Sequence, residues 1–147
     1  MNPFEGYKIT SPYGLRKSPI TGAEEFHTGI DLVIADKADI KAFVEGKVIF
    51  AMFAPLGTGV GGFGNAVLIQ DKNGYVHLYG HLFSIAVKVG DVVKQGQVIG
   101  KQGNTGQSAG SHLHYEIRTQ SSPSFGWRHN IEPTQYLIKF NSQNQKK

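Results

Sequence analysis

The sequence contains no cysteine, and this absence limits the chemistry available to the chain. Without thiols, it can form neither a disulfide framework nor a thiolate metal site. A metal ion could be held only by imidazole nitrogens and carboxylate oxygens. Because six histidines are present, zinc with histidine and aspartate ligands is the first metal to consider.

Long apolar runs are also missing. The longest one, at 48–56, is far shorter than the roughly 20 residues that cross a bilayer. The first ten residues lack the basic and apolar regions of a secretory signal. The net charge is +4, but the basic residues do not form the clusters typical of nucleic-acid-binding proteins. The sequence therefore predicts neither a membrane nor a nucleic acid as partner.

Convincing helical periodicity is absent, whereas turn residues are abundant. The 147 residues match the length of one domain, and 19 glycines separate short β-branched runs. This texture predicts an all-β fold. Asp71 to Gly74 should form a hairpin turn that makes its two flanking strands antiparallel neighbours. The candidate strands are 40–53, 65–71, 74–82, 86–93 and 112–118.

Three stretches are expected to lie outside the sheet. The glycine-rich segments 54–64 and 100–111 are too long for simple hairpins and should cover a face or rim of the fold. Residues 141–147 are polar and aperiodic, which predicts a disordered tail or the start of a linker. The expected division is one domain over 1–140 and a tail over 141–147.

Two histidines separated by one leucine form the most informative motif. His112, His114, Glu116 and Arg118 alternate with apolar residues, as expected of a half-buried strand. On a strand, the two histidines would point to the same side about 6.6 Å apart and could share a metal site. Glu116 lies on the same face, but no HExxH motif is present, so we expect it to support a neighbouring group.

A second pair of possible ligands lies upstream, at His27 and Asp31. A straight strand would place these residues about 13 Å apart, too far for one ion. Gly29 between them permits a bend that brings both to one metal. Together with a histidine of the second motif, they offer the three protein ligands of a catalytic zinc site, with a fourth position for water.

His81 is the remaining candidate. It lies on the strand after the predicted hairpin, where it should share a face with His77 and Tyr79. We expect His77 and His129 to be structural.

These motifs follow one another in an order that resembles the lysostaphin-type zinc endopeptidases, which include the LytM-like catalytic domains of bacterial and phage cell-wall hydrolases. The signature pair of that family is H-x(3)-D and H-x-H, here His27 to Asp31 and His112 to His114. The resemblance covers nearly the entire chain. It extends through ITSPYGLR, HTGIDL, GNAVLIQ, YGHL, VKVGDVVKQGQVIG, GSHLHYEIR and NIEPTQYL.

The resemblance implies a twisted antiparallel β-sheet with a catalytic groove flanked by loops, of the lysostaphin/LytM-like, duplicated-hybrid-motif type. It also implies one zinc ion per chain, with His27, Asp31 and His114 as ligands. His112 and His81 take the catalytic positions beside the metal. The implied substrate is the peptide part of bacterial peptidoglycan.

We therefore predict a zinc-dependent endopeptidase that cleaves peptide cross-links of peptidoglycan with zinc-activated water and a histidine general base. It would act at the cell wall as a monomer, with a separate or fused wall-binding domain. Without a visible signal, it would be a phage endolysin or tail-associated enzyme made in the host cytoplasm and released by another factor, or a fragment of a larger secreted or virion protein. The alternatives are a non-catalytic wall-binding or regulatory module of the same fold, and a biotinyl- or lipoyl-like carrier built on 87–100.

Overall fold

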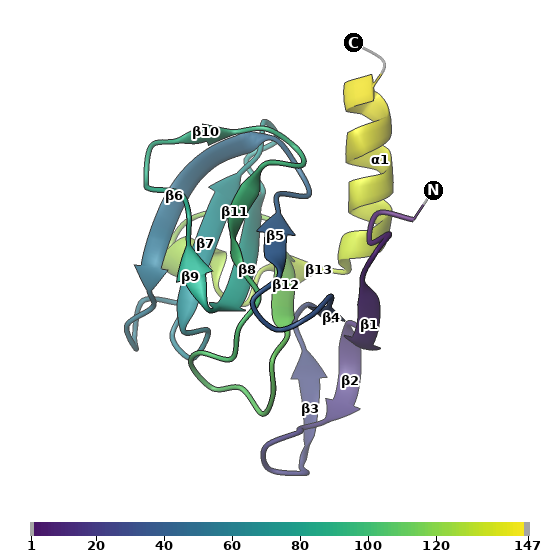
Figure 1. Cartoon of the computed structure of the whole chain (residues 1–147), viewed down its shortest axis with the longest axis vertical. Helices are drawn as coiled ribbons and strands as arrows, with labels where there is room; N and C mark the ends of the chain where they lie inside the picture. Colours follow the sequence, from purple (N-terminus) through teal and green to yellow (C-terminus); the bar gives the residue numbers. More distant parts are fainter. Residues whose placement is uncertain (1, 146–147) are drawn as a thin grey trace.

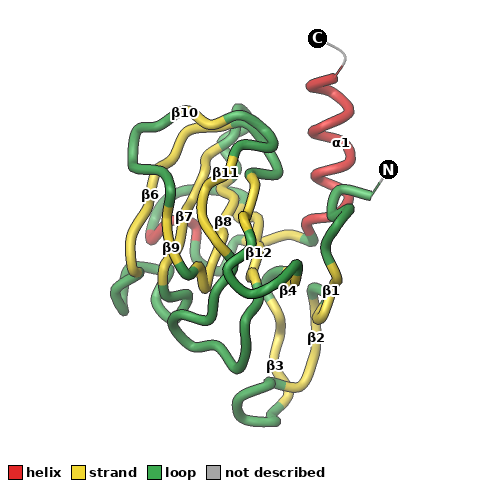
Figure 2. The backbone as a smooth tube through the Cα atoms, viewed as in Figure 1, coloured by secondary structure: helices red, strands yellow, loops and turns green. Residues whose placement is uncertain are grey.

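The computed structural model describes residues 2–145, and most of them lie in short strands and the loops between them (Figures 1 and 2). One α-helix follows the last strand. In chain order, the elements are β1 (Lys8–Ser11), β2 (Gly14–Lys17), β3 (Glu24–His27), β4 (Ile30–Val33), β5 (Asp39–Lys41), β6 (Gly46–Phe53), β7 (Asn65–Gln70), β8 (Val76–Leu82), β9 (Ser84–Ile85), β10 (Val92–Val93), β11 (Val98–Lys101), β12 (Leu113–Arg118), the 3₁₀ turn η1 (Ser124–Gly126), β13 (Asn130–Ile131) and α1 (Pro133–Gln145).

A large antiparallel sheet forms the centre of the fold, with strand order β1-β4-β12-β8-β7-β6-β10 and with β13 beside β12. Two smaller sheets accompany it, β5-β11-β9 and the hairpin β2-β3. Figure 1 shows this hairpin extending away from the rest of the molecule. Because β12 lies between β4 and β8, strands that are distant in sequence become neighbours at the centre of the sheet.

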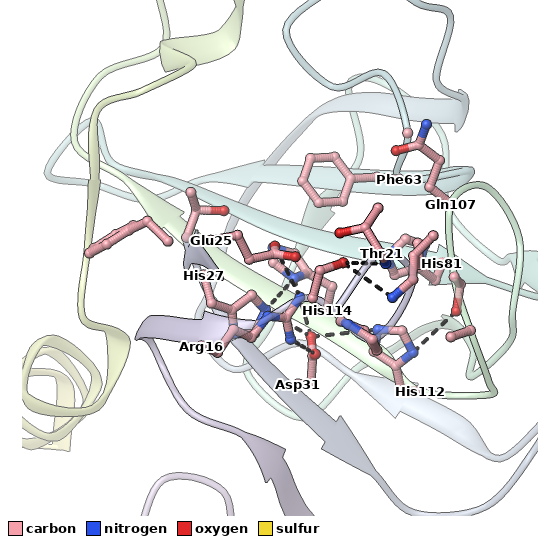
Figure 3. A pocket seen from close by; sticks show the side chains of 18 of the residues that line it. Arg16, Thr21, Glu25, His27, Asp31, Phe63, His81, Gln107, His112 and His114 are labelled. Atoms are coloured by element: carbon pink, nitrogen blue, oxygen red, sulfur yellow. Dashed lines mark hydrogen bonds and ion pairs between the residues drawn. The ribbon is translucent and has the colours of Figure 1, made fainter. Parts of the chain in front are cut away.

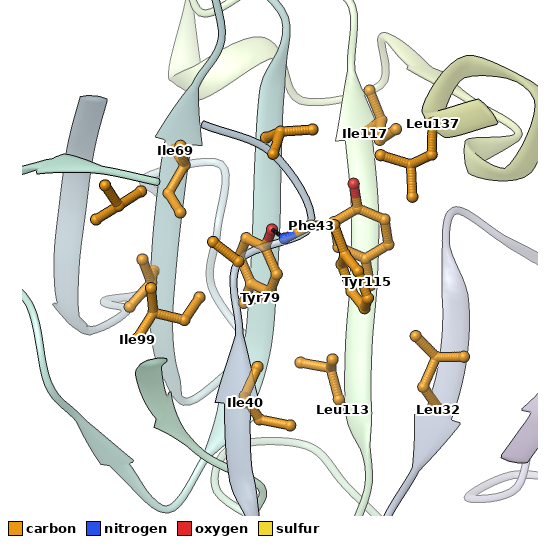
Figure 4. Packing of buried hydrophobic residues seen from close by; sticks show 14 of the residues in the cluster. Leu32, Ile40, Phe43, Ile69, Tyr79, Ile99, Leu113, Tyr115, Ile117 and Leu137 are labelled. Carbon is orange, nitrogen blue, oxygen red and sulfur yellow. Dashed lines mark hydrogen bonds between the residues drawn. The ribbon is translucent and has the colours of Figure 1, made fainter. Parts of the chain in front are cut away.

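The two faces of the large sheet have different roles. Side chains from one face pack into the main core, which includes Tyr79 on β8 and Tyr115 on β12. Figure 4 shows these rings beside Phe43, whose backbone N–H donates to the Tyr79 hydroxyl at 2.8 Å. On β12, the residues between the core positions point to the opposite face. That face therefore receives His114 and Glu116.

The all-β prediction and the predicted hairpin are confirmed. Strands β7 and β8 are antiparallel neighbours joined through Asp71 to Gly74. The predicted strand at 40–53 is wrong as one element, because it is divided into β5 and β6 in different sheets. The predicted strand at 86–93 is mostly loop, since only β10 is extended there.

The sequence shows no convincing helical periodicity and therefore predicts no helix. This prediction is wrong. Helix α1 begins at Pro133, a residue suited to the first helical position, and it continues to Gln145. Leu137 and Phe140 are buried in the main core, so tertiary packing stabilises the helix. The predicted irregular tail is thus wrong for 141–145, while 146–147 lie outside the described residues. The domain boundary at 140 stays a prediction. No helix in the described part of the chain is long and apolar enough to cross a membrane.

Candidate active site

Three side chains meet where β4 pairs with β12. His27 ends β3, and the chain turns through Thr28 and Gly29 into β4, which carries Asp31. Asp31 lies directly opposite His114 in the antiparallel register. Gly29 makes this turn possible, because a Cβ atom there would collide with the Tyr115 carbonyl oxygen and the His114 ring. The bend expected at Gly29 is therefore present.

The three side chains converge on one point (Figure 3). His27 Nε2 lies 3.1 Å from Asp31 Oδ1 and 3.2 Å from His114 Nδ1. The third edge of this triangle, between His114 Nδ1 and Asp31 Oδ1, is 3.3 Å. A tetrahedral zinc ion with ligand bonds of about 2.0–2.1 Å needs ligand atoms about 3.3 Å apart. The spacing therefore fits zinc.

The outer nitrogens of the two imidazoles are already engaged. His27 Nδ1 is 2.9 Å from the Pro12 carbonyl oxygen, to which it can only donate. His114 Nε2 lies 2.9 Å from Glu116 Oε1 and donates to this carboxylate. When both rings are neutral, His27 Nε2 and His114 Nδ1 each carry a lone pair. Both nitrogens face Asp31 Oδ1. A metal cation between these three atoms would interact favourably with all of them at once.

Arg16 holds the other oxygen of Asp31. Its Nη1 lies 2.7 Å from Asp31 Oδ2, while its Nη2 lies 3.6 Å from Glu25 on the neighbouring strand. Burial alone would raise the pKa of Asp31, but the adjacent rings of His114 and His27 lower it well below its usual value. Asp31 is therefore an ionised carboxylate with one oxygen held by Arg16 and one facing the two imidazoles.

Glu116 is the buried support of His114, as the sequence predicted. Its Oε1 accepts from His114 and, at 2.6 Å, from Thr28 Oγ1, and its Oε2 accepts from Arg118 Nε at 2.6 Å. Burial opposes ionisation here, but the hydrogen bond from His114 and the charge of Arg118 lower the pKa of Glu116 to about 2. Sequence reasoning placed Arg118 on the same strand face as Glu116 but gave it no role, and it missed Arg16, because a lone arginine carries no local pattern.

His112 lies beside the three converging atoms but outside them. It directly precedes β12, where it pairs with Gly103 as an isolated bridge. Its Nδ1 donates to the Gly110 carbonyl oxygen at 2.8 Å, so Nε2 of the neutral ring is a lone pair. That Nε2 is 3.5 Å from Asp31 Oδ1. The ring therefore presents a proton acceptor next to the candidate metal site.

His81 also reaches the site, but not by the route expected. The prediction that it shares a face with His77 and Tyr79 is wrong, because β8 bulges against β7 at this point. His81 adopts a left-handed conformation with φ of +62°. The alternation is broken, so Gly80 and His81 both face Phe63 on the site side, whereas Tyr79 points into the core. Such a bulge cannot be read from side-chain period.

The His81 ring is fixed in place. Its Nδ1 donates to the Thr105 carbonyl oxygen at 2.7 Å, and its centroid lies 4.8 Å from that of His112. Burial, more than any other cause, lowers the pKa of His81 to about 4. The ring is consequently neutral near pH 7, with Nε2 available to accept a hydrogen bond.

These side chains lie in a groove of about 740 Å³. Both long glycine-rich segments contribute to its walls, as the sequence predicted. The hairpin β2–β3 forms a further wall that sequence reasoning missed. The contributing residues are Gly61, Gly62 and Phe63 from the first segment, Gln107, Ser108 and Ala109 from the second, and Pro19, Ile20, Thr21 and Phe26 from the hairpin region.

His77 belongs to a separate buried network. Its Nε2 lies 2.8 Å from Asp71 Oδ2, and its Nδ1 lies 2.6 Å from the Tyr115 hydroxyl. Tyr136 on α1 donates to the same Asp71 oxygen at 2.5 Å. His77 therefore links the β7–β8 hairpin to the helix, which agrees with the structural role predicted for it.

The carrier alternative finds no support in the fold. A carrier needs an exposed lysine at a hairpin tip, and the candidate here is Lys72. Lys72 is exposed, but its ammonium group lies over the Phe140 ring, 5.4 Å from the centroid, and a carrier would give the histidines of the groove no role.

Comparison with known proteins places the chain in a family. The model of peptidase family M23 matches residues 25–125. The peptidoglycan DD-endopeptidase ShyA of Vibrio cholerae is 34% identical over 126 residues, which cover 85% of this chain and 28% of that protein. The chain spans about a quarter to a third of the length of the curated relatives that it matches.

Solved structures agree with this assignment. The catalytic domain of the antimicrobial peptidase lysostaphin from Staphylococcus simulans superimposes with a TM-score of 0.77 and 32% identity, covering 92% of this chain and 95% of that domain. A zinc-containing peptidase from Vibrio cholerae gives a TM-score of 0.70 and 32% identity over 89% of this chain and 38% of that one. The family model, the relative and the shared fold all lead to one conclusion: the chain belongs to peptidase family M23, a family of metallopeptidases.

Proposed function

We propose that this chain is a zinc-dependent endopeptidase domain that hydrolyses peptide cross-links of bacterial peptidoglycan. The observation that carries the proposal is the triangle of three ligand atoms, from His27, Asp31 and His114, in a groove that also contains the imidazoles of His112 and His81. One zinc ion per chain fits this donor set. The non-catalytic alternative would need one of these groups to be missing, and all five converge.

A peptide bond is hydrolysed slowly in water because water is a poor nucleophile and the carbonyl group is weakly polarised. The proposed metal would address both difficulties. A bound zinc ion lowers the pKa of water to about 7 and polarises the scissile carbonyl. The outer nitrogens of His27 and His114 are held by the groups behind them, and Asp31 is held by Arg16. These outer contacts fix ring orientation and carboxylate direction before the metal binds.

His112 is the proposed general base. Because its Nδ1 is engaged by the Gly110 carbonyl oxygen, its Nε2 carries the lone pair that can take the proton of the attacking water. The same nitrogen can then deliver that proton to the departing amine, as general acid–base catalysis requires. His81, neutral because of burial, accepts a hydrogen bond from the water through Nε2 and orients it. The two rings lie side by side, so both can reach one water.

The shape of the groove supports a peptide substrate. It is open along the surface between the β2–β3 hairpin and the two glycine-rich segments, as an extended chain requires. Glycines 61 and 62 let backbone approach the substrate closely. The names of the relatives, a peptidoglycan DD-endopeptidase and an antimicrobial peptidase, favour cross-links of the cell wall as substrate. The phage origin, the wall-binding domain and the monomeric state stay predictions.

A direct test is digestion of purified peptidoglycan of two cross-link types by the zinc-loaded protein, with sequencing of the new amino termini. We expect new termini at peptide bonds, roughly one zinc per chain by elemental analysis, and loss of activity with chelator that zinc restores. Lysis that persists after metal removal has been verified would refute the zinc mechanism. Release of reducing sugars without new amino termini would refute the peptidase assignment.

A further inference from the structure

A second cavity of about 430 Å³ lies beside the catalytic groove. The two cavities share Phe26, Thr28 and Phe63 in their walls. Its volume is in the range of ligand-binding pockets. A peptide that crosses the candidate metal site can therefore place a neighbouring residue in this second cavity, which we call the side cavity.

Arg128 and Trp127 form the polar wall of the side cavity. The guanidinium carbon of Arg128 lies over the Trp127 ring, 4.2 Å from its centroid, which is within the range of a cation–π contact. Stacking covers one face of a guanidinium but leaves its N–H edge available for a carboxylate. Within residues 2–145, we find no hydrogen bond or ion pair for the Arg128 side chain, and the residue is exposed.

The backbone supports a specific role for this arginine. Arg128 has φ of +74°, a conformation that is costly for a residue with a Cβ atom. Such strain persists only where surrounding structure imposes it, and it often accompanies ligand-binding positions. Here the strained turn projects a stacked arginine beside the catalytic groove.

The remaining polar groups of the side cavity also favour an anion. The Tyr13 hydroxyl donates to Asn130 Oδ1 at 2.8 Å, which leaves the Asn130 amide nitrogen as a second donor in the wall. Glu116 is the acidic residue of this wall, and Arg118 pairs with it at 2.6 Å. The pair neutralises itself, so Arg128 contributes the uncompensated charge of the cavity.

We propose that the side cavity is a subsite for a free carboxylate of the substrate peptide, with Arg128 as its principal donor. This inference rests on the proposed function and specifies its substrate class. Cell-wall stem peptides carry carboxylates on D-glutamate and on diamino dicarboxylic acids, whereas amidated stems and glycine bridges are neutral near the cleaved bond. The chain then prefers cross-links that retain a carboxylate there.

The test compares three cross-linked stem-peptide dimers: one unmodified, one amidated at the diamino acid, and one amidated at D-glutamate. Binding is measured by calorimetry with the zinc-loaded His112→Ala protein, in which turnover should be about 10²-fold or more slower, and the dimers are checked for cleavage after each run. Trp127 is the only tryptophan of the sequence, so its fluorescence reports binding at the side cavity. We expect amidation at one of the two positions to raise Kd about tenfold, since a charge-assisted hydrogen bond is lost. The position that responds identifies the source of the carboxylate.

Variants at Arg128 decide the interpretation. In the same background, Arg128→Gln should raise the Kd of the unmodified dimer about tenfold and abolish its advantage over the amidated one. Arg128→Lys should recover part of this advantage, because the charge remains without the planar fork. The control is Lys47→Gln, which removes the same charge from an exposed residue outside both cavities. It should leave the preference for the unmodified dimer unchanged.

Two results would overturn the subsite. One is an equal Kd for all three dimers with the protein that retains Arg128. The other is an Arg128→Gln protein that retains the full preference for the carboxylate. Failure of the proposed function would appear separately, as absence of peptidoglycan hydrolysis by the zinc-loaded wild-type protein, and the binding comparison would still be informative.

Discussion

Glu116→Gln should lower the free energy of unfolding by about 3 kcal/mol at pH 7. The carboxylate accepts from His114, Thr28 and Arg118, and it is almost fully buried. Its pKa of about 2, against an ordinary 4.5, corresponds to about 3 kcal/mol of preference for the charged form in the fold. The glutamine keeps the size but leaves the buried Arg118 charge without its acidic partner, with only the Gly59 and Phe125 carbonyl oxygens to accept from it.

Urea unfolding of the metal-free proteins measures this difference, and the melting temperature should fall by about 6–12 °C for a chain of this length. Thr28→Val is the matched control: it removes one neutral donor from the same carboxylate and should cost about 1 kcal/mol. Because the folded pKa is depressed, the contribution of Glu116 is complete above pH 4.5 and declines as the pH falls toward about 2. A Glu116→Gln protein within 1 kcal/mol of wild type at pH 7 would refute the reasoning.

Further predictions concern the site and its surroundings. His114→Ala should lose zinc and activity together, whereas His112→Ala should keep zinc but lose about 10²-fold or more in kcat; equal zinc loss in both, measured by elemental analysis, would make His112 a ligand. Burial lowers the pKa of His77 despite Asp71, so the unfolded chain takes up the proton first and stability should decline as the pH falls below about 6.5; an NMR titration that shows no lowering of the His77 pKa in the folded protein would contradict this. Gly29→Ala should weaken zinc binding and lower the melting temperature, because its Cβ collides with the turn around His114; unchanged values by titration and calorimetry would argue against that turn.

Local pattern was sufficient for several features of the protein. The alternation around His112 and His114 predicted a half-buried strand; the strand β12 is present there, but the prediction of half burial is wrong, because all six of its residues are buried. The turn at Asp71 to Gly74 predicted the β7–β8 pairing, and Gly29 predicted the bend before Asp31. Each of these signals lies within a few neighbouring residues, where side-chain period and backbone freedom act directly.

The remaining features depend on contacts between distant segments. His81 reaches the site because β7 forces a bulge into β8, and nothing adjacent to His81 in sequence announces it. Helix α1 has a polar composition toward its end and forms because Leu137 and Phe140 enter the main core. Arg128 came next to the catalytic groove only through folding. The sequence by itself determined which residues could bind a metal and where strands run. Tertiary structure alone decided which side chains face one another, because pairing register and packing are set by partners far along the chain.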